Sequence, residues 1–562
     1  MGSTTRTRGT AGRRVRLGVL VGATAVLVAT LATAAFGAAV ASAQSWPSWG
    51  HDLANSRSQP LESILNPGNV GELTRKWAHL TAGYVSATPA VAGGIVYFPD
   101  SAGYLYALNA TTGTRVWRTR ISTYDGIAKS VSRVSPVVWG NYLILGDRGD
   151  NSGADQSVSA RVFAVDRFTG RLVWMTQVSS HHAAQITASP VVAKNLVIVA
   201  VSSNEEGDAE LASYPCCTFR GSVVALSART GAIRWTTYMV PPNSGPCTGN
   251  EPGIGPVGCG YSGAAVWGSP AVDTKTGQVF VGTGNDYTTP DSATACQEAA
   301  MSSGTSDANC TAPDDYFDAV VAMKLSNGKV EWGHKVEGWD ASNLACDNGP
   351  PGATWCPSIT SPDYDFGDSP NIMQITGAKG KRETVVGIGQ KSGVYWTLDA
   401  ATGRIVWNSL VGPGGGLGGI VWGTAYDGQR IYVPLSNSDG TAYDLGGPGG
   451  PPASGGSWAA LDPQTGAFDW QVATPGAAAA YGPASVANGV VYVGDMAPSG
   501  DNMFALDAAT GKTLWSFAAA GSVNASPAIV DGTLYWGSGY GALEPSWTGS
   551  HVFYAFGLPN KS

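Results

Sequence analysis

Apolar residues recur along this chain in short runs separated by polar turns, and many runs end in one shared phrase. The phrase reads Ala-Leu-x-x-x-Thr-Gly-x-x-x-Trp, with small variations. It appears seven times and closes at Trp117, Trp174, Trp235, Trp332, Trp407, Trp470 and Trp515. A glycine at its centre supplies the positive φ of a tight turn. We therefore expect a strand, a turn and a second strand whose tryptophan packs against the neighbouring repeat.

A second phrase lies upstream of these endings and reads roughly Ser-Pro-x-Val-x-x-Gly-x-x-Tyr-x-Gly. Clear copies occupy residues 88–100, 135–147 and 526–539. This pattern predicts another hairpin, so each repeat should contain four short antiparallel strands. Four-stranded repeats that return every 40–97 residues are typical of the blades of a β-propeller.

The two ends of the repeat array complete each other. The last repeat, from Ser526 onward, contains three strands but no closing tryptophan strand, whereas the segment ending at Trp77 is such a strand with nothing before it. Joining the two removes the exposed sheet edges. We expect an all-β, eight-bladed propeller over residues 44–562 as a single domain, closed by its N-terminal strand. The alternative is an open array of seven units with a frayed eighth.

Two of the repeats carry insertions. Trp235 and Trp332 are 97 residues apart, and Trp332 and Trp407 are 75 apart, against 40–63 elsewhere. All eight cysteines lie between residues 216 and 356, in or beside these insertions. Eight cysteines allow 105 pairings, but they group as neighbours. The neighbouring pairs are 216–217, 247–259, 296–310 and 346–356. We expect disulfide-stapled loops that cap one mouth of the ring.

Charge and the N-terminus indicate an exported, acidic protein. Five arginines and an apolar stretch precede Ala41-Ser42-Ala43, which predicts a signal peptide over residues 1–43; an uncleaved membrane anchor is the alternative. The remaining chain has 41 acidic and 28 basic residues, a poor match to nucleic acid. We expect a secreted or extracytoplasmic protein with no stable membrane span in its mature part, and the many cysteines agree with an oxidising compartment.

Several phrases resemble the quinoprotein alcohol dehydrogenases. They are the repeat endings, the opening at 45–77 and the stretch 266–285, which ends in Gly-Thr-Gly-Asn. The likeness is closest to the polyvinyl alcohol dehydrogenase branch at 216–221, 361–367 and 389–393. The resemblance implies an enzyme that uses pyrroloquinoline quinone (PQQ) and Ca²⁺ to oxidise alcohols, with secondary alcohols or polymers like polyvinyl alcohol as substrates.

The resemblance also implies residues that hold the quinone. Cys216 and Cys217 match a vicinal disulfide that covers one face of the cofactor, and Trp267 matches the tryptophan on the other face. Lys391 matches the lysine or arginine that bonds the paired quinone oxygens. Thr187 and Arg148 match contacts to a cofactor oxygen and a cofactor carboxylate.

Metal ligands and a general base follow from the same resemblance. Asn285 and Glu206 match the family's Ca²⁺ ligands, with Glu205 as the competitor of Glu206, because the cysteine pair follows this glutamate instead of lying one blade earlier. Asp365 matches the catalytic aspartate, which also approaches the metal. Asp363 and Asp368 are its rivals. Gly367 stands where lanthanide-using relatives carry another aspartate, which favours Ca²⁺.

The implied chemistry is hydride transfer from the alcohol carbon to the quinone, with proton removal by Asp365 and a positive charge from Ca²⁺ and Lys391. The reduced quinone then passes electrons to an external acceptor, a cytochrome or another redox protein. Two other interpretations remain. One is a non-catalytic propeller that binds or scaffolds; the other is a quinoprotein for sugars. The pair His181-His182 is interpreted as a surface feature.

Overall fold

Both phrases of the repeat form β-hairpins, and the two hairpins join into one four-stranded antiparallel sheet. In the first blade the strands are β3 (Ala90–Ala92), β4 (Ile95–Pro99), β5 (Tyr104–Asn109) and β6 (Arg115–Arg120). β3 is mostly buried and β6 is largely exposed, so the tryptophan strand is the outer one. The computed structural model describes residues 45–559 except 151–158, 252–254, 306–308, 349–354, 358, 360, 362 and 378–379. The predicted signal peptide lies outside the described residues.

The same sheet recurs through the chain. Blades two to four are β8 (Val137–Trp139), β9 (Tyr142–Gly146), β11 (Arg161–Asp166) and β12 (Leu172–Gln177); β14 (Val191–Ala193), β15 (Leu196–Ser203), β16 (Ser222–Ser227) and β17 (Ile233–Tyr238); and β21 (Ala271–Asp273), β22 (Gln278–Gly282), β24 (Ala319–Lys324) and β25 (Val330–Lys335). Blades five to seven are β26 (Asn371–Thr376), β27 (Arg382–Gly389), β28 (Val394–Asp399) and β29 (Ile405–Leu410); β30 (Ala425–Tyr426), β31 (Ile431–Leu435), β34 (Ser457–Leu461) and β35 (Phe468–Ala473); and β36 (Ser485–Ala487), β37 (Val490–Gly494), β38 (Met503–Asp507) and β39 (Thr513–Phe517).

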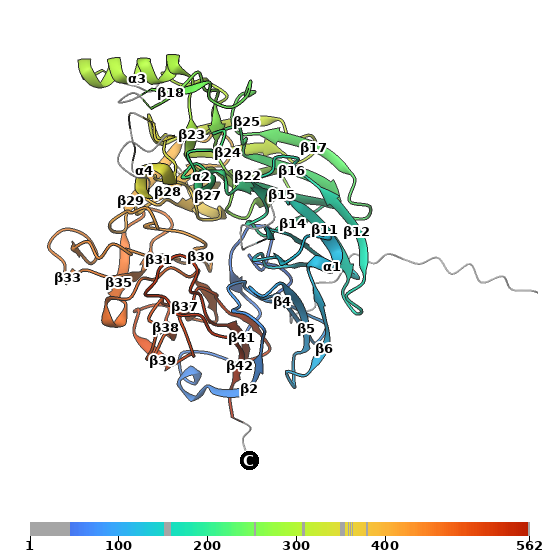
Figure 1. Ribbon diagram of the computed structural model, residues 1–562. Coiled ribbons are helices and arrows are strands. Elements are labelled where there is room, and N and C mark those ends of the chain that lie inside the picture. Colours follow the sequence, from blue (N-terminus) through green and yellow to red (C-terminus); the bar gives the residue numbers. More distant parts are fainter. Residues whose placement is uncertain are drawn as a thin grey trace, which may run out of the picture. The chain divides into compact units, whose positions relative to one another are not determined.

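The eighth blade joins the two ends of the array. It consists of β40 (Ala528–Val530), β41 (Thr533–Gly537), β42 (Val552–Gly557) and β2 (Thr74–Leu80). β2 pairs antiparallel with β42, and Trp77 lies opposite Ala555. In Figure 1 the blue β2 lies beside the red β42. The predicted eight-bladed propeller and its closure by an N-terminal strand are therefore confirmed.

Tryptophan and glycine of the repeat phrase lock each blade to the next. The indole nitrogen of Trp332 donates a hydrogen bond to the Ala400 carbonyl of the following blade at 3.1 Å. The same ring lies directly against Gly403, whose φ is +72°. An equivalent bond is present at each of the remaining blade boundaries. Between blades seven and eight, for example, Trp515 donates to the Leu73 carbonyl at 3.1 Å. The turn glycine is thus required twice, for its backbone angle and for the space it leaves to the indole.

We expect Gly403→Ala to lower the free energy of unfolding by about 2–4 kcal/mol. An added Cβ would lie 2.5 Å from the Trp332 ring, and alanine also strains at this φ. Gly277→Ala is the control, because Gly277 has φ +77° with nothing near its missing Cβ; we expect a cost of about 1 kcal/mol there. Urea unfolding followed by tryptophan fluorescence measures both, and equal costs would contradict the proposed indole contact.

A segment near the N-terminus crosses the centre of the ring. Its carbonyls accept amide hydrogen bonds from the inner strands of blades two, four, five, six and seven: Pro47 from Val138, Leu53 from Val272, Ala54 from Ile372, Ser56 from Tyr426 and Arg57 from Val486. Trp46 pairs with Val91 of the first blade, and β1 (Ser58–Gln59) runs parallel to β36. Residues 46–59 therefore span the central channel and connect most of the blades.

Arg57 is the charged centre of this segment. Its side chain is fully buried, and its guanidinium lies over the Trp49 ring at 4.3 Å. It donates to the carbonyls of Ala484 (2.6 Å) and Trp49 (2.8 Å) and to the hydroxyls of Thr88, Ser485 and Ser526. Burial lowers the pKa of Arg57 to about 9. The five bonds offset the cost of placing this group in the interior.

The remaining elements lie in loops between blade strands. They are η1 (Val70–Glu72), α1 (Ser122–Asp125), β7 (Ser130–Val131), β10 (Gly149–Asp150), β13 (Ala184–Gln185), α2 (Glu205–Asp208), β18 (Gly249–Glu251), β19 (Gly255–Val257), β20 (Ser262–Gly263), β23 (Asp286–Thr288), α3 (Asp291–Ser303), α4 (Leu344–Asn348), β32 (Tyr443–Asp444), β33 (Pro452–Ala453) and η3 (Pro475–Ala477). Figure 1 shows α3 and β18 together at one edge of the molecule, in the insertion of blade four. None of the helices in the described part of the chain has the length and apolar character needed to cross a bilayer.

Four disulfides lie in or beside the inserted loops. They join Cys216 to Cys217, Cys247 to Cys259, Cys296 to Cys310 and Cys346 to Cys356. The neighbour pairing is therefore confirmed.

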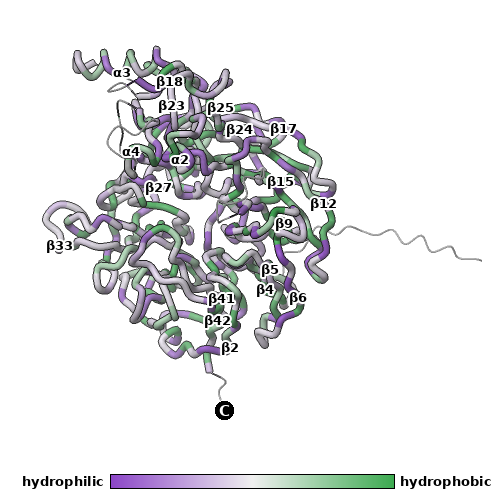
Figure 2. The backbone as a smooth tube through the Cα atoms, in the orientation of Figure 1, coloured by the Kyte–Doolittle hydropathy of each residue, from purple (hydrophilic) through white to green (hydrophobic). Residues whose placement is uncertain are grey.

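The apolar interior is divided among the contacts between neighbouring blades. One cluster contains Leu145, Phe163, Val199 and Val224 of blades two and three, and similar clusters follow around the ring. Figure 2 shows hydrophobic and hydrophilic stretches interspersed throughout the molecule instead of gathered on one side. This distribution follows from a ring in which every sheet packs against two others.

Asp495, at the end of β37, gives a pH-dependent prediction. Its side chain is fully buried; Oδ1 accepts the Ala497 amide at 3.0 Å, and Oδ2 is buried without a hydrogen bond. Burial raises the pKa of Asp495 from 3.8 to about 7. Between these values the folded state holds a proton that the unfolded chain has released, so stability falls as the pH rises through this window. We expect the free energy of unfolding of Asp495→Asn, relative to that of wild type, to rise by about 2 kcal/mol as the pH increases from 5 to 8. Urea unfolding at several pH values measures this, and a difference that does not change with pH would contradict it.

Candidate active site

Asp365 lies where blades four and five meet, just before β26. Its Oδ1 accepts a hydrogen bond from the backbone N–H of Asn285 at 2.7 Å, and its Oδ2 accepts one from the indole N–H of Trp267 at 3.1 Å. The Lys391 ammonium lies 3.1 Å from the same Oδ2. Asp365 is 5% exposed, so these contacts hold the carboxylate in one orientation. Four residues that the sequence resemblance assigned separately are therefore neighbours in the structure.

Lys391 carries the positive charge of this cluster. It follows β27, is 9% exposed, and lies 2.8 Å from Asp363 Oδ2 and 5.6 Å from the centre of the Trp267 ring. Burial disfavours the charged ammonium, but the carboxylates of Asp363, Asp365 and Glu206 more than offset it and hold the pKa of Lys391 well above its usual value. The ammonium is thus a fixed positive charge at neutral pH.

The donor set around this lysine suits a hard cation. Three carboxylates, those of Asp363, Asp365 and Glu206, share one ammonium, and Asp363 Oδ1 is buried without a hydrogen bond. The side-chain nitrogen of Asn285, Nδ2, donates to the Asp286 carbonyl and to Ser342, which leaves the side-chain oxygen for another partner. Within the described residues no three acidic, histidine or cysteine side chains gather closely enough to bind a metal alone. These oxygens fit Ca²⁺ when further ligands come from a cofactor.

Glu205 and Glu206, adjacent on α2, have different surroundings. Glu205 is fully buried and accepts the amides of Thr218 (2.8 Å) and Phe219 (2.7 Å). Glu206 is partly exposed and acts electrostatically on Asp363 and Lys391. The structure thus directs one carboxylate to the loop of the cysteine pair and the other toward the lysine cluster.

Cys216 and Cys217 form a disulfide and are both fully buried. They belong to the apolar cluster against which Trp267 packs. Gly367 lies directly against the outer ring atoms of Trp267, so any side chain at 367 would meet the indole. The glycine there is therefore needed for the position of the tryptophan, a packing role beyond the absence of an extra acidic ligand.

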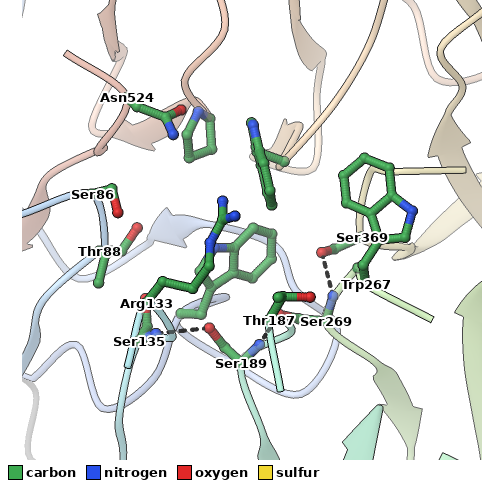
Figure 3. A pocket seen from close by; sticks show the side chains of 15 residues that line it. Ser86, Thr88, Arg133, Ser135, Thr187, Ser189, Trp267, Ser269, Ser369 and Asn524 are labelled. Atoms are coloured by element: carbon green, nitrogen blue, oxygen red, sulfur yellow. Dashed lines mark hydrogen bonds between the residues drawn. The ribbon is translucent and has the colours of Figure 1, made fainter. Parts of the chain in front are cut away.

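A central cavity adjoins Trp267. Trp49, Trp422, Arg133 and Thr187 also line it, and Figure 3 shows Arg133 and Trp267 approaching it from opposite sides. Around it lies a ring of hydroxyls from the Ser-Pro phrases, in which the amides of Ser135, Ser189 and Ser269 each donate to the serine of the next blade (Ser189, Ser269 and Ser369) at 2.8–2.9 Å. The second phrase of the repeat therefore links inner strands around the axis, which its sequence pattern did not indicate.

A second cavity beside the first is lined by two arginines. Arg133 borders both cavities, with its guanidinium 4.3 Å from the Trp422 ring, and Arg148 lines the second with Tyr84 and Tyr540. Burial and the like charge of Arg133 lower the pKa of Arg148. Thr187 instead bonds Ser202 at 2.7 Å at the wall of the first cavity. The pair of arginines suits a ligand carboxylate. Arg133 was not among the predicted residues, although it stands two positions before a Ser-Pro phrase.

The rivals of Asp365 have other surroundings. Asp368 is fully buried and accepts hydrogen bonds from Ser369, Gly389 and Thr424, so it joins blades five and six. Asp363 pairs with Lys391. His181 is not a plain surface residue, because its Nε2 lies 3.0 Å from Thr218 Oγ1 and 3.4 Å from Glu205; His182 is exposed.

Sequence comparisons place this geometry in a family. Residues 175–343 match the protein family described as "Glucose/ethanol/alcohol dehydrogenase, beta-propeller domain". Residues 75–216 and 454–544 match the family described as "Outer membrane protein assembly factor BamB". The chain is 30% identical over 550 residues to the polyvinylalcohol dehydrogenase of Sphingopyxis sp. (strain 113P3), covering 92% of this chain and 77% of that protein. The chain belongs to the PQQ-dependent alcohol dehydrogenase family. As a PQQ-dependent alcohol dehydrogenase, it is an oxidoreductase acting on CH–OH groups.

Other relatives agree with this family. The polyvinylalcohol dehydrogenase of a Pseudomonas sp. is 29% identical over 549 residues, with 92% of this chain and 77% of that protein covered. The quinohemoprotein alcohol dehydrogenase structure from Comamonas testosteroni superimposes with a TM-score of 0.65 at 22% identity, over 92% of this chain and 81% of that one. The structure of a europium-containing methanol dehydrogenase superimposes with a TM-score of 0.63 at 18% identity, over 92% of this chain and 98% of that one. Both structures show that this PQQ-dependent alcohol dehydrogenase shares their fold.

Proposed function

We propose that this protein is a PQQ- and Ca²⁺-dependent dehydrogenase of secondary alcohols, including polymers like polyvinyl alcohol. The observation that carries the proposal is the convergence of Asp365, Lys391, Trp267 and Asn285 in one buried cluster. The names of the two relatives that match 92% of the chain support the polymeric substrate.

Each residue of the cluster has a proposed role in holding the cofactor. Trp267 and the Cys216–Cys217 disulfide would lie on two sides of the quinone, and Lys391 would bond its oxygens. Arg133 and Arg148, with Thr187 at the cavity wall, would bind its carboxylates and oxygens. Glu206, Asn285 and Asp365 would hold Ca²⁺. When bound, PQQ supplies a two-electron acceptor and Ca²⁺ a positive charge that polarises it.

Asp365 is the proposed general base. Its hydrogen bonds with Asn285 and Trp267 hold the carboxylate in one orientation beside the Lys391 ammonium, where it can accept the proton of an alcohol hydroxyl. The Lys391 charge also favours electron density that develops next to it during the reaction. Burial of the cluster excludes bulk water from these charges.

The surroundings of the reaction are also proposals. The proposed partner that would accept the electrons is an external one, a cytochrome or another redox protein. Export by the N-terminal segment would place the enzyme outside the cytoplasm, which four disulfides favour.

Dye-linked oxidation by the full-length protein tests the proposed function. The protein is loaded with PQQ and Ca²⁺ and offered 2-propanol, 2,4-pentanediol and polyvinyl alcohol beside ethanol and glucose. We expect turnover that requires both additives, with secondary alcohols and the polymer preferred. Turnover without Ca²⁺ after chelation would contradict the metal, and glucose as the best substrate would favour a sugar dehydrogenase. Protein that binds no PQQ would favour a non-catalytic propeller.

A further inference from the structure

A buried carboxylate, that of Glu205, accepts several hydrogen bonds from the loop that carries the vicinal disulfide. Glu205 Oε1 accepts the Tyr214 hydroxyl and the Thr218 amide, both at 2.8 Å, and its Oε2 accepts the Phe219 amide at 2.7 Å. Tyr214 precedes Cys216 by two residues, and Thr218 follows Cys217 directly. The carboxylate therefore accepts hydrogen bonds from loop residues on both sides of the cysteine pair.

Two histidines extend this network. His181 Nε2 lies 3.4 Å from Glu205 and 3.0 Å from Thr218 Oγ1, and His182 Nε2 lies 2.7 Å from the Tyr214 hydroxyl. The imidazole rings stack with their centres 4.5 Å apart. Burial raises the pKa of Glu205, but its bonds to His181, Thr218 and Phe219 more than offset this, so its pKa lies below the usual value.

The opposite edge of the cysteine pair is held by backbone acceptors. The Cys216 carbonyl accepts the amide of Cys247 at 2.9 Å, and the Cys217 carbonyl accepts the Asn243 side chain at 3.3 Å. Cys247 is itself bonded to Cys259. Without Glu205 the backbone amides of Thr218 and Phe219 would lose their carboxylate acceptor, and the loop would depend more on this edge.

We propose that Glu205 is a positioning residue, whose buried carboxylate holds the Cys216–Cys217 ring in place while its neighbour Glu206 faces the cation. Consecutive residues of a helical turn point about 100° apart, which explains how one short helix serves both tasks. Because the fully buried Glu205 carboxylate already accepts three hydrogen bonds from the loop and lies beside His181, it is a poor candidate for the metal. This inference rests on the proposed function for the role of the ring, but the anchoring itself is a property of the protein without cofactor.

Reduction of the disulfides in cofactor-free protein is the first test. Wild type, Glu205→Gln and the matched control Glu206→Gln are exposed to a phosphine reductant, and alkylated cysteines are counted by mass spectrometry. We expect Cys216–Cys217 to be reduced about 10-fold faster in Glu205→Gln, because local opening becomes easier, and at the wild-type rate in Glu206→Gln. Cys296–Cys310 in the same sample should keep its rate in all three. An unchanged rate for Cys216–Cys217 in Glu205→Gln would overturn the proposal.

Ligand affinities separate anchoring from metal binding. We expect Glu205→Gln to weaken PQQ binding about 10-fold and to leave Ca²⁺ affinity at saturating PQQ unchanged, whereas Glu206→Gln should weaken Ca²⁺ affinity about 10–100-fold. Loss of Ca²⁺ affinity in Glu205→Gln instead would make Glu205 the ligand and overturn the proposal. If Glu205→Gln does not fold, Tyr214→Phe removes one donor and keeps the carboxylate; faster reduction supports the anchor and an unchanged rate overturns it. Wild type that binds no PQQ would remove the proposed function, while the reduction rates would still decide the anchor.

Discussion

Replacing Asp365 with asparagine is expected to lower kcat by about 10²–10⁴-fold, because the alcohol proton loses its acceptor. The new asparagine side chain keeps an oxygen that can accept the backbone N–H of Asn285. Its nitrogen, however, lies opposite the Trp267 N–H and the Lys391 ammonium, which both need an acceptor. Binding of PQQ should survive, since Trp267, the cysteine ring and the arginines remain. Steady-state dye reduction and a separate PQQ titration measure the two quantities.

Asp363→Asn is the matched control, two residues away in the same cluster. It removes one of the two carboxylates that contact Lys391 but leaves the proposed base intact, so we expect a fall in kcat of about 10-fold or less. A large loss in Asp363→Asn together with a small one in Asp365→Asn would assign the base to Asp363.

Replacing Arg57 with leucine is expected to destabilise the fold by about 3–5 kcal/mol. The leucine leaves the carbonyls of Trp49 and Ala484 without donors in the interior and breaks the contact with three hydroxyls from blades one, seven and eight. The hydroxyls can still bond one another, which limits the loss. The midpoint of urea unfolding, followed by tryptophan fluorescence, measures the effect.

Arg171→Leu serves as the control, because Arg171 is exposed in the turn between β11 and β12. We expect a change within about 0.5 kcal/mol there. Arg57→Lys keeps the charge but reaches fewer acceptors, so it should lie between the two. Equal midpoints for Arg57→Leu and Arg171→Leu would show that the segment across the channel contributes little to stability.

The repeat phrases were sufficient to predict the propeller because their signals are local. A glycine turn and a tryptophan ten residues after the first alanine define a hairpin wherever they occur, and the missing strand at one end matched the spare strand at the other. The cysteine pairing was predictable for a similar reason, since each bond closes a short loop. The predicted export and the excess of acidic over basic residues after position 43 likewise depend on composition and order alone.

The family resemblance also brought the proposed site residues to attention, but it left neighbouring residues as rivals. Asp363, Asp365 and Asp368 stand within six residues, and only their contacts separate an ion pair with Lys391, an oriented carboxylate and a link between blades. Glu205 and Glu206 are equivalent in the sequence, and their surroundings differ because one faces the cysteine loop.

The sequence by itself determined the blade, the number of blades, the closure of the ring and the family resemblance, because each depends on patterns within short segments. Only the tertiary structure decided that residues 46–59 cross the channel, that the Ser-Pro hydroxyls join blade to blade, and that Arg133 lies between two cavities. These features bring together residues from blades far apart in the chain, so no local pattern carries them. They follow from the geometry of a closed ring, in which every inner strand faces the same axis.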